Sequence, residues 1–402
     1  MKQQADLIVD SLLVDNFALF HVQDRPYLVS KQTGVVLSTE GSAEMFMDLL
    51  GAGLSQHEVI QLVAEAYNLP QEQITGDLRG FLDSLERLSE APSSQQDGPD
   101  GFPIGDFIPG DKEILTEGTG EEQVRYFVIA GHCFEFIAPA SLGLDPVDAL
   151  FESFMAEASS VETPTRVMVE KGGNGYALRV GDEIKSAYDD IAQTPQFMRS
   201  ALFEYIASQT PFSVFLHAAA IENQRKEAVL FIAPSGHGKS TLMAELVFRG
   251  QGYLGDDAIM LSLPDQTVQA IPSALNLKSG AWELFSDRIT DLDDYDVYES
   301  EGRTLKYIPL ACSDKALKQR LDCCGVIFPE YSAYATPEFR QLAPGEIFSK
   351  LKDAGVHTNA EAGEEMSRLF VEFFLDRECY AMRYSHSDQA ISFLADQALV
   401  VR

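Results

Sequence analysis

Cysteine is scarce in this chain of 402 residues, and its five copies are Cys133, Cys312, Cys323, Cys324 and Cys379. None of them forms a CxxC pair, which argues against a zinc site, and a small odd number argues against a disulfide framework. Long apolar runs are missing as well. No segment approaches the ~18 apolar residues of a membrane span, and the N-terminus leads into no signal-peptide core. We therefore expect a cytoplasmic protein without a membrane partner.

Basic residues are also few, with 30 Lys and Arg against 62 Asp and Glu, a formal net charge of -32. Such a chain is repelled by nucleic-acid backbones and anionic membranes, so we expect no nucleic-acid partner. Solubility explains the acidity equally well, and the charge therefore identifies no partner. Hydrophobic residues make up 45% of the chain, enough to bury cores, and the length predicts two or three domains.

The sequence divides into four parts. Residues 1–90 form a small unit, and residues 91–102 have the polar, Pro-, Gly- and Ser-rich composition of a linker. Residues 103–210 form a β-rich lead-in to the largest part, residues 211–402. That last part alternates strands and helices, which predicts an α/β or α+β core with a mixed sheet covered by helices.

Local patterns predict the individual elements. In the first part they predict strands over 17–22, 26–30 and 35–37, then helices over 42–50, 55–67 and 70–88, an order that suggests a winged helix. In the lead-in they predict a hairpin of 124–129 and 132–137, a helix over 146–155, strands over 167–169 and 176–180, and a helix over 194–208. In the last part they predict strands over 214–220, 228–232, 258–262, 325–328 and 380–384, and helices over 239–249, 343–351, 362–374 and 388–400.

The most informative segment is Phe231-Ile-Ala-Pro-Ser-Gly-His-Gly-Lys-Ser-Thr241. It follows an apolar strand pattern and precedes a helical pattern, Leu242–Phe248, which is the setting that a phosphate-binding loop requires. Gly236 and Gly238 lack Cβ atoms, so the backbone can curl and aim successive N–H groups into one concavity. The start of the following helix adds unpaired donors and a partial positive charge. The segment therefore predicts a nucleoside-triphosphate site.

The side chains of this loop have predicted roles. Lys239 can neutralise the terminal phosphates, and Ser240 or Thr241 can offer a hydroxyl to Mg²⁺. Ala233 stands where such loops usually begin with glycine, and a Gly-Ser strand-to-helix turn with an exposed lysine is the alternative. The predicted nucleotide-binding residues are Ser235, Gly236, His237, Gly238, Lys239, Ser240 and Thr241.

Two carboxylates, Asp256 and Asp257, stand at a predicted strand start one short helix beyond Lys239. One of them can reach Mg²⁺ or its water shell, while the other can accept a proton from an attacking hydroxyl. Solvated aspartates in an acidic turn are the alternative. His217 lies in an apolar strand pattern before the loop, and in isolation such a histidine is more often a core residue than a catalyst.

The order of these residues resembles the HPr kinase/phosphorylase family, whose core is related to phosphoenolpyruvate carboxykinase. The matching features are His217, the run Ala233-x-Ser235-Gly-x-Gly-Lys-Ser240, the pair Arg249-Gly250 and the pair Asp256-Asp257. The resemblance implies ATP and Mg²⁺ as cofactors and assigns each site residue a role. It places Lys239 on the β- and γ-phosphates, Ser240 and Asp256 on the metal, Asp257 as the base toward a serine hydroxyl, and His217 near the transferred phosphate.

The chain departs from that family downstream. A Glu-x-Arg-Gly-x-Gly segment, which supplies a second metal ligand in the family, has no counterpart, and Ile271-Pro-Ser-Ala-Leu-Asn-Leu-Lys278-Ser-Gly280 stands instead. Such a segment is similar to that of divergent HPr kinase-related proteins in peptide-modifying gene clusters. The departure puts HPr as substrate and the reverse reaction in doubt. Lys278 is a candidate phosphate or substrate contact, and an exposed turn lysine is the alternative.

The first part of the chain resembles the PqqD-like family, which captures leader peptides of ribosomally made, modified peptides. The residues that carry this resemblance are Tyr27-Leu-Val29, the run Gly51–Ile60 and the helix pattern Pro70–Leu85. In such folds a peptide adds as a strand to an exposed sheet edge, which implies peptide contacts at Tyr27, Leu28 and Val29. The alternatives are a purely structural cap and a DNA-binding winged helix, although residues 1–90 are not basic.

Together the two resemblances predict an ATP- and Mg²⁺-dependent kinase acting on a Ser or Thr hydroxyl of a ribosomally synthesised peptide. The tethered first part would capture that peptide and raise its concentration near the active site. Two alternatives stay open, a nucleotide-regulated peptide-binding chaperone without phosphoryl transfer and a small-molecule kinase acting on free serine or a sugar. The identity of the peptide stays open at this point. Whether the protein forms a homo-oligomer stays open as well.

Overall fold

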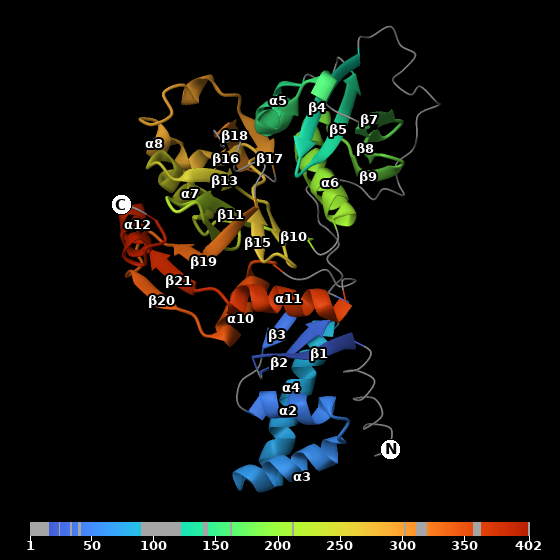
Figure 1. Cartoon of the computed structure of the whole chain (residues 1–402), viewed down its shortest axis with the longest axis vertical. Helices are drawn as coiled ribbons and strands as arrows, with labels where there is room; N and C mark the ends of the chain where they lie inside the picture. Colours follow the sequence, from blue (N-terminus) through green and yellow to red (C-terminus); the bar gives the residue numbers. More distant parts are fainter. Residues whose placement is uncertain are drawn as a thin grey trace.

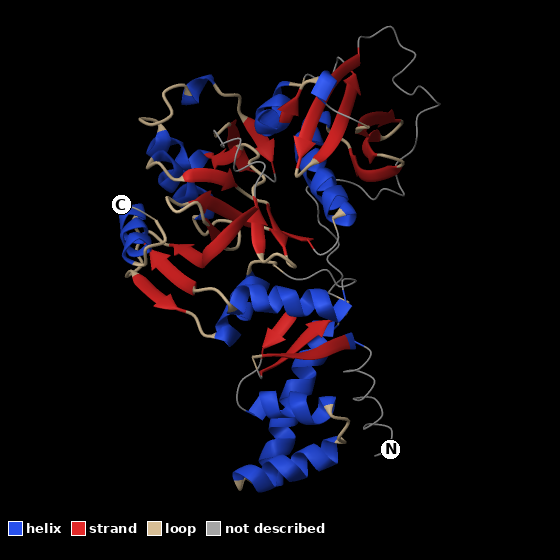
Figure 2. Ribbon diagram, in the orientation of Figure 1, coloured by secondary structure: helices blue, strands red, loops and turns tan. Residues whose placement is uncertain are grey.

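The computed structural model describes residues 16–23, 25–32, 34–38, 42–89, 122–139, 144–160, 163–210, 213–300, 303–310, 320–356 and 363–400. The predicted linker, residues 91–102, lies outside these ranges. Within them the chain forms four sheets with helices around them, which confirms the expected mixture of α and β structure (Figure 1, Figure 2). None of the described helices is both long and apolar enough to cross a membrane.

The N-terminal unit (described residues 16–89) is a three-stranded antiparallel sheet followed by three helices. Its elements are β1 (Phe17–Val22), β2 (Arg25–Ser30), β3 (Val36–Ser38), α2 (Ser42–Gly51), α3 (Gln56–Tyr67) and α4 (Gln71–Ser89), as predicted. Helix α3 begins at Gln56 because Ser55 and Glu58 form a capping box. The Ser55 N–H donates to Glu58 Oε2 (2.8 Å), and the Glu58 N–H donates to Ser55 Oγ (3.4 Å).

The middle unit (described residues 122–210) is a six-stranded sheet with the order β6-β4-β5-β7-β8-β9. Its elements are β4 (Glu122–Ile129), β5 (His132–Pro139), α5 (Asp145–Phe151), β6 (Met155–Ala156), β7 (Thr165–Gly172), β8 (Gly175–Val180), β9 (Glu183–Tyr188) and α6 (Thr194–Gln209). The hairpin predicted around Ala130-Gly131 is confirmed. The helix predicted over 146–155 is too long, because α5 ends at Phe151 and a 3₁₀ turn leads into β6, which pairs with β4.

The C-terminal unit (described residues 213–400) is built on a nine-stranded mixed sheet. The order of its main path is β10-β14-β15-β19-β12-β11-β13, and β21 joins β19 to β20. These strands are β10 (Ser213–Leu216), β11 (Ala218–Glu222), β12 (Ala228–Ile232), β13 (Gly252–Gly255), β14 (Ile259–Ser262), β15 (Thr267–Gln269), β19 (Arg320–Tyr331), β20 (Glu338–Gln341) and β21 (Cys379–Tyr384). A smaller sheet, β16-β18-β17, contains β16 (Leu275–Lys278), β17 (Tyr298–Ser300) and β18 (Arg303–Ile308). The helices are α7 (Lys239–Phe248), α8 (Trp282–Phe285), α10 (Pro344–Asp353), α11 (Gly363–Leu375) and α12 (Ser387–Asp396).

Both faces of the nine-stranded sheet are covered at its central strand β12, whose side chains point alternately to the two faces. In β12, Ala228, Leu230 and Ile232 belong to a core shared with α10 and α11. Val229 and Phe231 belong to a core on the other face, shared with α7, α12 and β16. The sheet is therefore the middle layer of three, which explains why β12 is a continuous apolar run in the sequence.

The prediction of one strand over 214–220 is wrong in one respect, because the strand is interrupted at His217. β10 pairs with β14, whereas β11 pairs with β12 and β13. The register continues across the break as far as Ala220, since Leu216 lies opposite Ile259 and Ala220 lies opposite Gly255, and it shifts by one residue after Ala220. The break at His217 therefore faces the break between β13 and β14. Interruptions of this kind in a ladder often lie next to active sites, because they redirect side chains.

The N-terminal sheet is packed between its own helices and the helix pair α10 and α11 (Figure 1). The Tyr27 ring meets the Phe348 ring of α10 edge-on, with 5.4 Å between centroids, and Gln23 Nε2 donates to Asp376 Oδ1 over 3.2 Å. Tyr27, Leu28 and Val29 are 0%, 2% and 4% exposed and lie in the central strand. The prediction that these three residues contact a peptide therefore needs correction: their side chains are core, and the sheet edges are β1 and β3.

Candidate active site

The predicted phosphate loop follows β12 and leads into α7, as the sequence indicated. Gly236 and Gly238 have φ values of 89° and 83°, left-handed values that favour glycine. Gly238 is also in close contact with its surroundings, since a Cβ there would lie 2.7 Å from Tyr331 Cβ and from the Tyr384 hydroxyl. The Tyr331 N–H donates to the His237 carbonyl (3.1 Å), and the Tyr384 hydroxyl donates to the Gly238 carbonyl (3.3 Å). Residues of β19 and β21 thus hold the backbone of the loop in place through these hydrogen bonds.

A cavity of about 390 Å³ opens over this loop. Predicted site residues in its lining are His217, Ser235, Gly236, Gly238, Lys239, Ser240, Thr241, Asp257 and Lys278. Its more apolar wall includes Leu277, Ala281, Leu284, Tyr331 and Tyr384. Asp256 is buried next to this lining and accepts a hydrogen bond from Ser240. His237 is absent from the lining, and its Nδ1 is buried without a hydrogen-bond partner among the described residues. The structure therefore gathers every predicted site residue of this unit except His237.

Lys239 is the buried cation of the cavity. The residue is 5% exposed, and its Nζ has no hydrogen-bond partner among the residues that the structure describes. Burial lowers its pKa, while the nearby charges of Asp256 and Asp257 act in the opposite direction. A buried ammonium without a partner is unfavourable by itself, so this position suits a ligand that brings negative charge.

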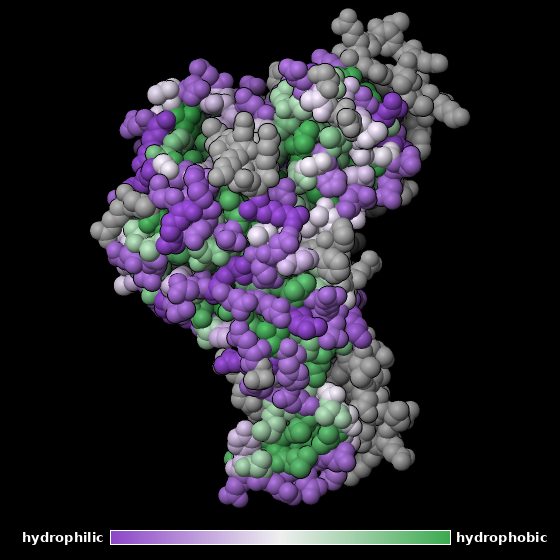
Figure 3. All heavy atoms as spheres, viewed as in Figure 1, coloured by the Kyte–Doolittle hydropathy of each residue, from purple (hydrophilic) through white to green (hydrophobic). Residues whose placement is uncertain are grey.

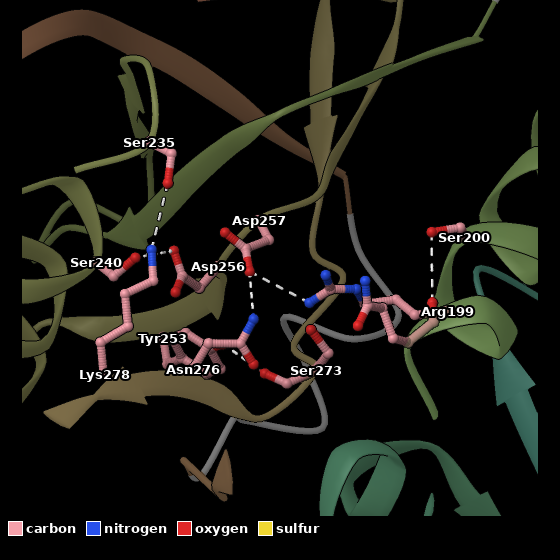
Figure 4. A network of polar contacts seen from close by, with 11 residues as sticks. Arg199, Ser200, Ser235, Ser240, Tyr253, Asp256, Asp257, Ser273, Asn276 and Lys278 are labelled. Carbon is pink, nitrogen blue, oxygen red and sulfur yellow. Dashed lines mark hydrogen bonds and ion pairs between the residues drawn. The ribbon is translucent and has the colours of Figure 1, made fainter. Parts of the chain in front are cut away.

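Asp256 is 1% exposed and lies beside the first turn of α7. Ser240 Oγ donates to Asp256 Oδ1 over 3.0 Å, and Oδ2 has no hydrogen-bond partner within the described part of the chain (Figure 4). Burial, reinforced by the charge of Asp257, raises the pKa of Asp256 to about 7. A hydroxyl and a carboxylate held side by side are hard oxygen ligands, the kind that Mg²⁺ prefers.

Asp257 is held by two donors on one of its oxygens (Figure 4). Arg199 Nη1 lies 3.2 Å from Asp257 Oδ2, and the Asn276 amide donates to the same oxygen. Burial favours the neutral form, but the charges of Arg199 and Lys239 outweigh it and keep the pKa of Asp257 below its ordinary value. Its backbone is left-handed (φ 68°) at the break between β13 and β14, so adjacent Asp256 and Asp257 take different surroundings.

His217 lies at the opposing break and lines the cavity beside Lys239. The imidazole is open to the cavity. Desolvation by the surrounding protein and the charge of Lys239 nevertheless lower the pKa of His217 to about 4. The imidazole is therefore neutral near neutral pH. A neutral ring next to bound phosphate can donate or accept a hydrogen bond without adding charge.

Strand β16 supplies two side chains to the site. Lys278 Nζ donates to Ser235 Oγ over 3.3 Å, which places the lysine at the phosphate loop. Asn276 contacts Asp257 from the same face of the strand, because residues two apart point the same way. The sequence reasoning selected Lys278 but missed Asn276, although this period of two was a signal that could have found it. It also missed Arg199, for which no local pattern exists.

No family model matches this chain, and no curated protein matches it in sequence. Among solved structures, a match is the Hpr(Ser) kinase/phosphatase from Coxiella burnetii. It is 14% identical, covers 46% of this chain and 97% of that chain, and has a TM-score of 0.22. A score of that size supports no conclusion about fold or function, so function has to be inferred from the site itself.

Proposed function

We propose that this protein is an ATP- and Mg²⁺-dependent kinase with an HPr kinase-related C-terminal unit. The observation that carries the proposal is the position of Lys239. This buried cation has no hydrogen-bond partner in the described structure, and it lies in the glycine-containing loop beside two carboxylates. A terminal phosphate would supply the charge that Lys239 needs, and the backbone donors at the start of α7 would bind the other phosphate oxygens.

The residues present fit Mg²⁺ as a partner of bound phosphate. Ser240 Oγ and Asp256 Oδ2 are the protein ligands that we infer, and Oδ2 is buried without a hydrogen-bond partner among the described residues. The described residues contain no cluster of three or more His, Cys, Asp or Glu that could hold a metal alone. This agrees with Mg²⁺ sites that use one or two carboxylates together with substrate phosphates and waters. When bound, Mg²⁺ would neutralise charge on the phosphate oxygens.

Asp257 is the residue that we infer to act on the acceptor. The acceptor hydroxyl oxygen forms a bond to the terminal phosphorus, the bond from that phosphorus to the bridging oxygen breaks, and the hydroxyl proton passes to Asp257. A carboxylate whose pKa is held low is a weak base. That suffices, because phosphoryl transfer depends chiefly on positioning and charge neutralisation.

For the acceptor, we propose a Ser or Thr of a peptide captured by the N-terminal unit, which we interpret as PqqD-like. Support comes from its order of three strands and three helices, and from β1 and β3, each of which pairs on one side within the described residues. Apolar surface gathers on the helical end of this unit (Figure 3), and Leu62 and Tyr67 of α3 are 45% and 53% exposed. A peptide strand added to either edge could place apolar side chains near these helices.

The kinase proposal is tested with ATP labelled in its γ-phosphate and a synthetic library of Ser- and Thr-containing peptides, of which the tightest binder to the full chain serves as the precursor peptide. Transfer of label to the peptide is expected, and Asp257→Asn is expected to reduce its rate by about 100-fold or more. Asp148→Asn is the matched control, because Asp148 pairs with Arg125 (2.9 Å) in the middle unit. Failure to transfer label to any hydroxyl acceptor, or an unchanged rate in Asp257→Asn, contradicts the proposal.

The burial of Tyr27 and Val29 against α10 and α11 favours one alternative, a small-molecule kinase in which the N-terminal unit is structural. Deleting the N-terminal unit would not separate the two cases, because it would expose Phe348 and its neighbours. Hydrogen exchange does separate them. Binding of the precursor peptide should slow amide exchange in β1 or β3, whereas phosphorylation of free serine without any such protection would favour the alternative.

A further inference from the structure

The middle unit contributes a side chain to the active site. Arg199 belongs to α6, whose apolar residues Phe197, Met198 and Leu202 lie in the core of the middle unit. From the same helix the Arg199 guanidinium reaches Asp257 of the C-terminal unit, with Nη1 3.2 Å from Oδ2. Both side chains are 20% exposed, so solvent screens this pair less than a surface ion pair.

Helix α6 is fixed relative to the C-terminal unit. The Phe203 ring stacks on Phe215 of β10, with centroids 5.3 Å apart and planes 8° from parallel. Ala258 and Met260, which follow Asp257 in the chain, belong to the same core as α6. The position of Arg199 is therefore set by the packing that surrounds the break at Asp257, and not by a flexible surface contact.

Asn276 of β16 is the second residue that contacts the Asp257 carboxylate. Its amide donates to Asp257 Oδ2, the oxygen that Arg199 contacts, so both donors hold one oxygen (Figure 4). The described structure gives Oδ1 no hydrogen-bond partner, and Figure 4 shows it turned away from Arg199, on the side of Ser240 and Lys278. Asp257 lines the cavity, so this free oxygen is available to an acceptor.

We propose that Arg199 and Asn276 are positioning residues that clamp Oδ2 of Asp257 and thereby aim Oδ1 at the acceptor hydroxyl. This inference rests on the proposed kinase function. It makes the middle unit part of the active site, because α6 supplies the cation of the clamp. Neither residue touches the reacting atoms, so their contribution is to the geometry of the transfer step. A misplacement of about 1 Å at a reacting group can cost on the order of 100-fold in rate.

The first experiment compares Arg199→Ala with the wild-type full chain under the labelled-ATP assay. We expect kcat to fall by roughly 10- to 100-fold, while the Kd of a fluorescent ATP analogue stays within about threefold. Arg199→Lys should be intermediate, because lysine restores the charge but not the guanidinium geometry. Arg179→Ala is the matched control, since Arg179 pairs with Glu170 (2.7 Å) on the same unit with similar exposure.

Chemical rescue distinguishes positioning from a general loss of structure. Methylguanidinium in solution should restore part of kcat in Arg199→Ala and none in Asp257→Asn. A loss of ATP affinity that accounts for the whole loss of rate, or an unchanged kcat in Arg199→Ala, would overturn the clamp.

A second arm does not depend on activity. In the ligand-free full chain, Arg199→Ala should lower Tm more in the wild-type background than in the Asp257→Asn background, because contacting residues are energetically coupled. Additive effects on Tm, with kinase activity present, overturn the clamp alone. A coupled cycle in a protein that transfers no phosphate overturns the proposed function, and with it the catalytic role of the clamp.

Discussion

Ser240 Oγ lies 3.0 Å from Asp256 Oδ1, a hydrogen bond that connects the first turn of α7 to the break between β13 and β14. Most of helix α7 and all of strand β13 separate the two residues in sequence, yet the fold places a hydroxyl and a carboxylate at one side of the phosphate loop. Because Asp256 is buried, this pair is fixed by the fold and needs no ligand to assemble. Burial disfavours the ionised form of the Asp256 carboxyl, so the stability of the fold should depend on pH.

The stability of the metal-free protein should fall as pH rises through the range in which Asp256 ionises. An unfolded carboxyl has a pKa of about 4, whereas burial raises that of Asp256 to about 7, so the folded state holds the proton more tightly. Stability is therefore lost between these two values as pH increases. With a chelator present, the drop in Tm between about pH 5 and about pH 8 should be smaller in Asp256→Asn than in wild type, by about 2 °C or more. Equal drops in the two proteins would contradict the assigned burial.

Lys239→Met should stabilise the ligand-free protein while removing nucleotide binding. The substitution replaces a buried charge that has no hydrogen-bond partner in the described residues with an apolar side chain of similar length. We expect Tm to rise on the order of 2 °C and the ATP-dependent increase in Tm to disappear. Lys226→Met is the control, because Lys226 is exposed and pairs with Glu222 (3.3 Å). A lower Tm together with retained ATP stabilisation would show that Lys239 has a purely structural role.

The two loop glycines should differ in their tolerance of alanine. Both have left-handed backbones, which costs a residue with a Cβ about 1–2 kcal/mol. A Cβ at Gly236 would meet no heavy atom within 4 Å, whereas one at Gly238 would lie 2.7 Å from Tyr331 and Tyr384. Gly238→Ala should therefore lower Tm clearly more than Gly236→Ala and weaken ATP binding more. Equal effects, measured by thermal unfolding and by titration with the fluorescent analogue, would argue against this packing of the loop.

The phosphate loop could be predicted from the sequence because its signal is local. A buried strand, two glycines and a helix start follow one another within 231–248, and each is set by neighbouring residues. Asp256 and Asp257 were found for the same reason, since they follow the loop by one short helix. Helices α4, α10 and α11 were likewise indicated by the periodic spacing of their apolar residues, whereas α6 and α7 have no such narrow apolar stripe.

What the sequence could not indicate depends on contacts between distant segments. The break at His217 is caused by pairing with two different partners, β14 and β12, while its local pattern is a single apolar run. The short strands β13, β15, β16 and β20 have three or four residues each, too few for a period of two to stand out. Arg199 approaches Asp257 across 58 positions of sequence, and an arginine on a helix ordinarily faces solvent.

Tyr27 gives a last prediction, which separates a core residue from a peptide contact. Its side chain is 0% exposed and packs edge-on against Phe348, so Tyr27→Ala removes a large ring from the layer between β2 and α10. Comparable aromatic truncations cost about 3–5 kcal/mol, and a marked fall in Tm is therefore expected. Tyr27→Phe keeps the ring, so it should retain most of the stability and phosphorylate the precursor peptide at the wild-type rate. If Tyr27→Ala instead kept its Tm and lost peptide affinity alone, the ring would face the peptide and the docking of the N-terminal sheet on α10 would be wrong.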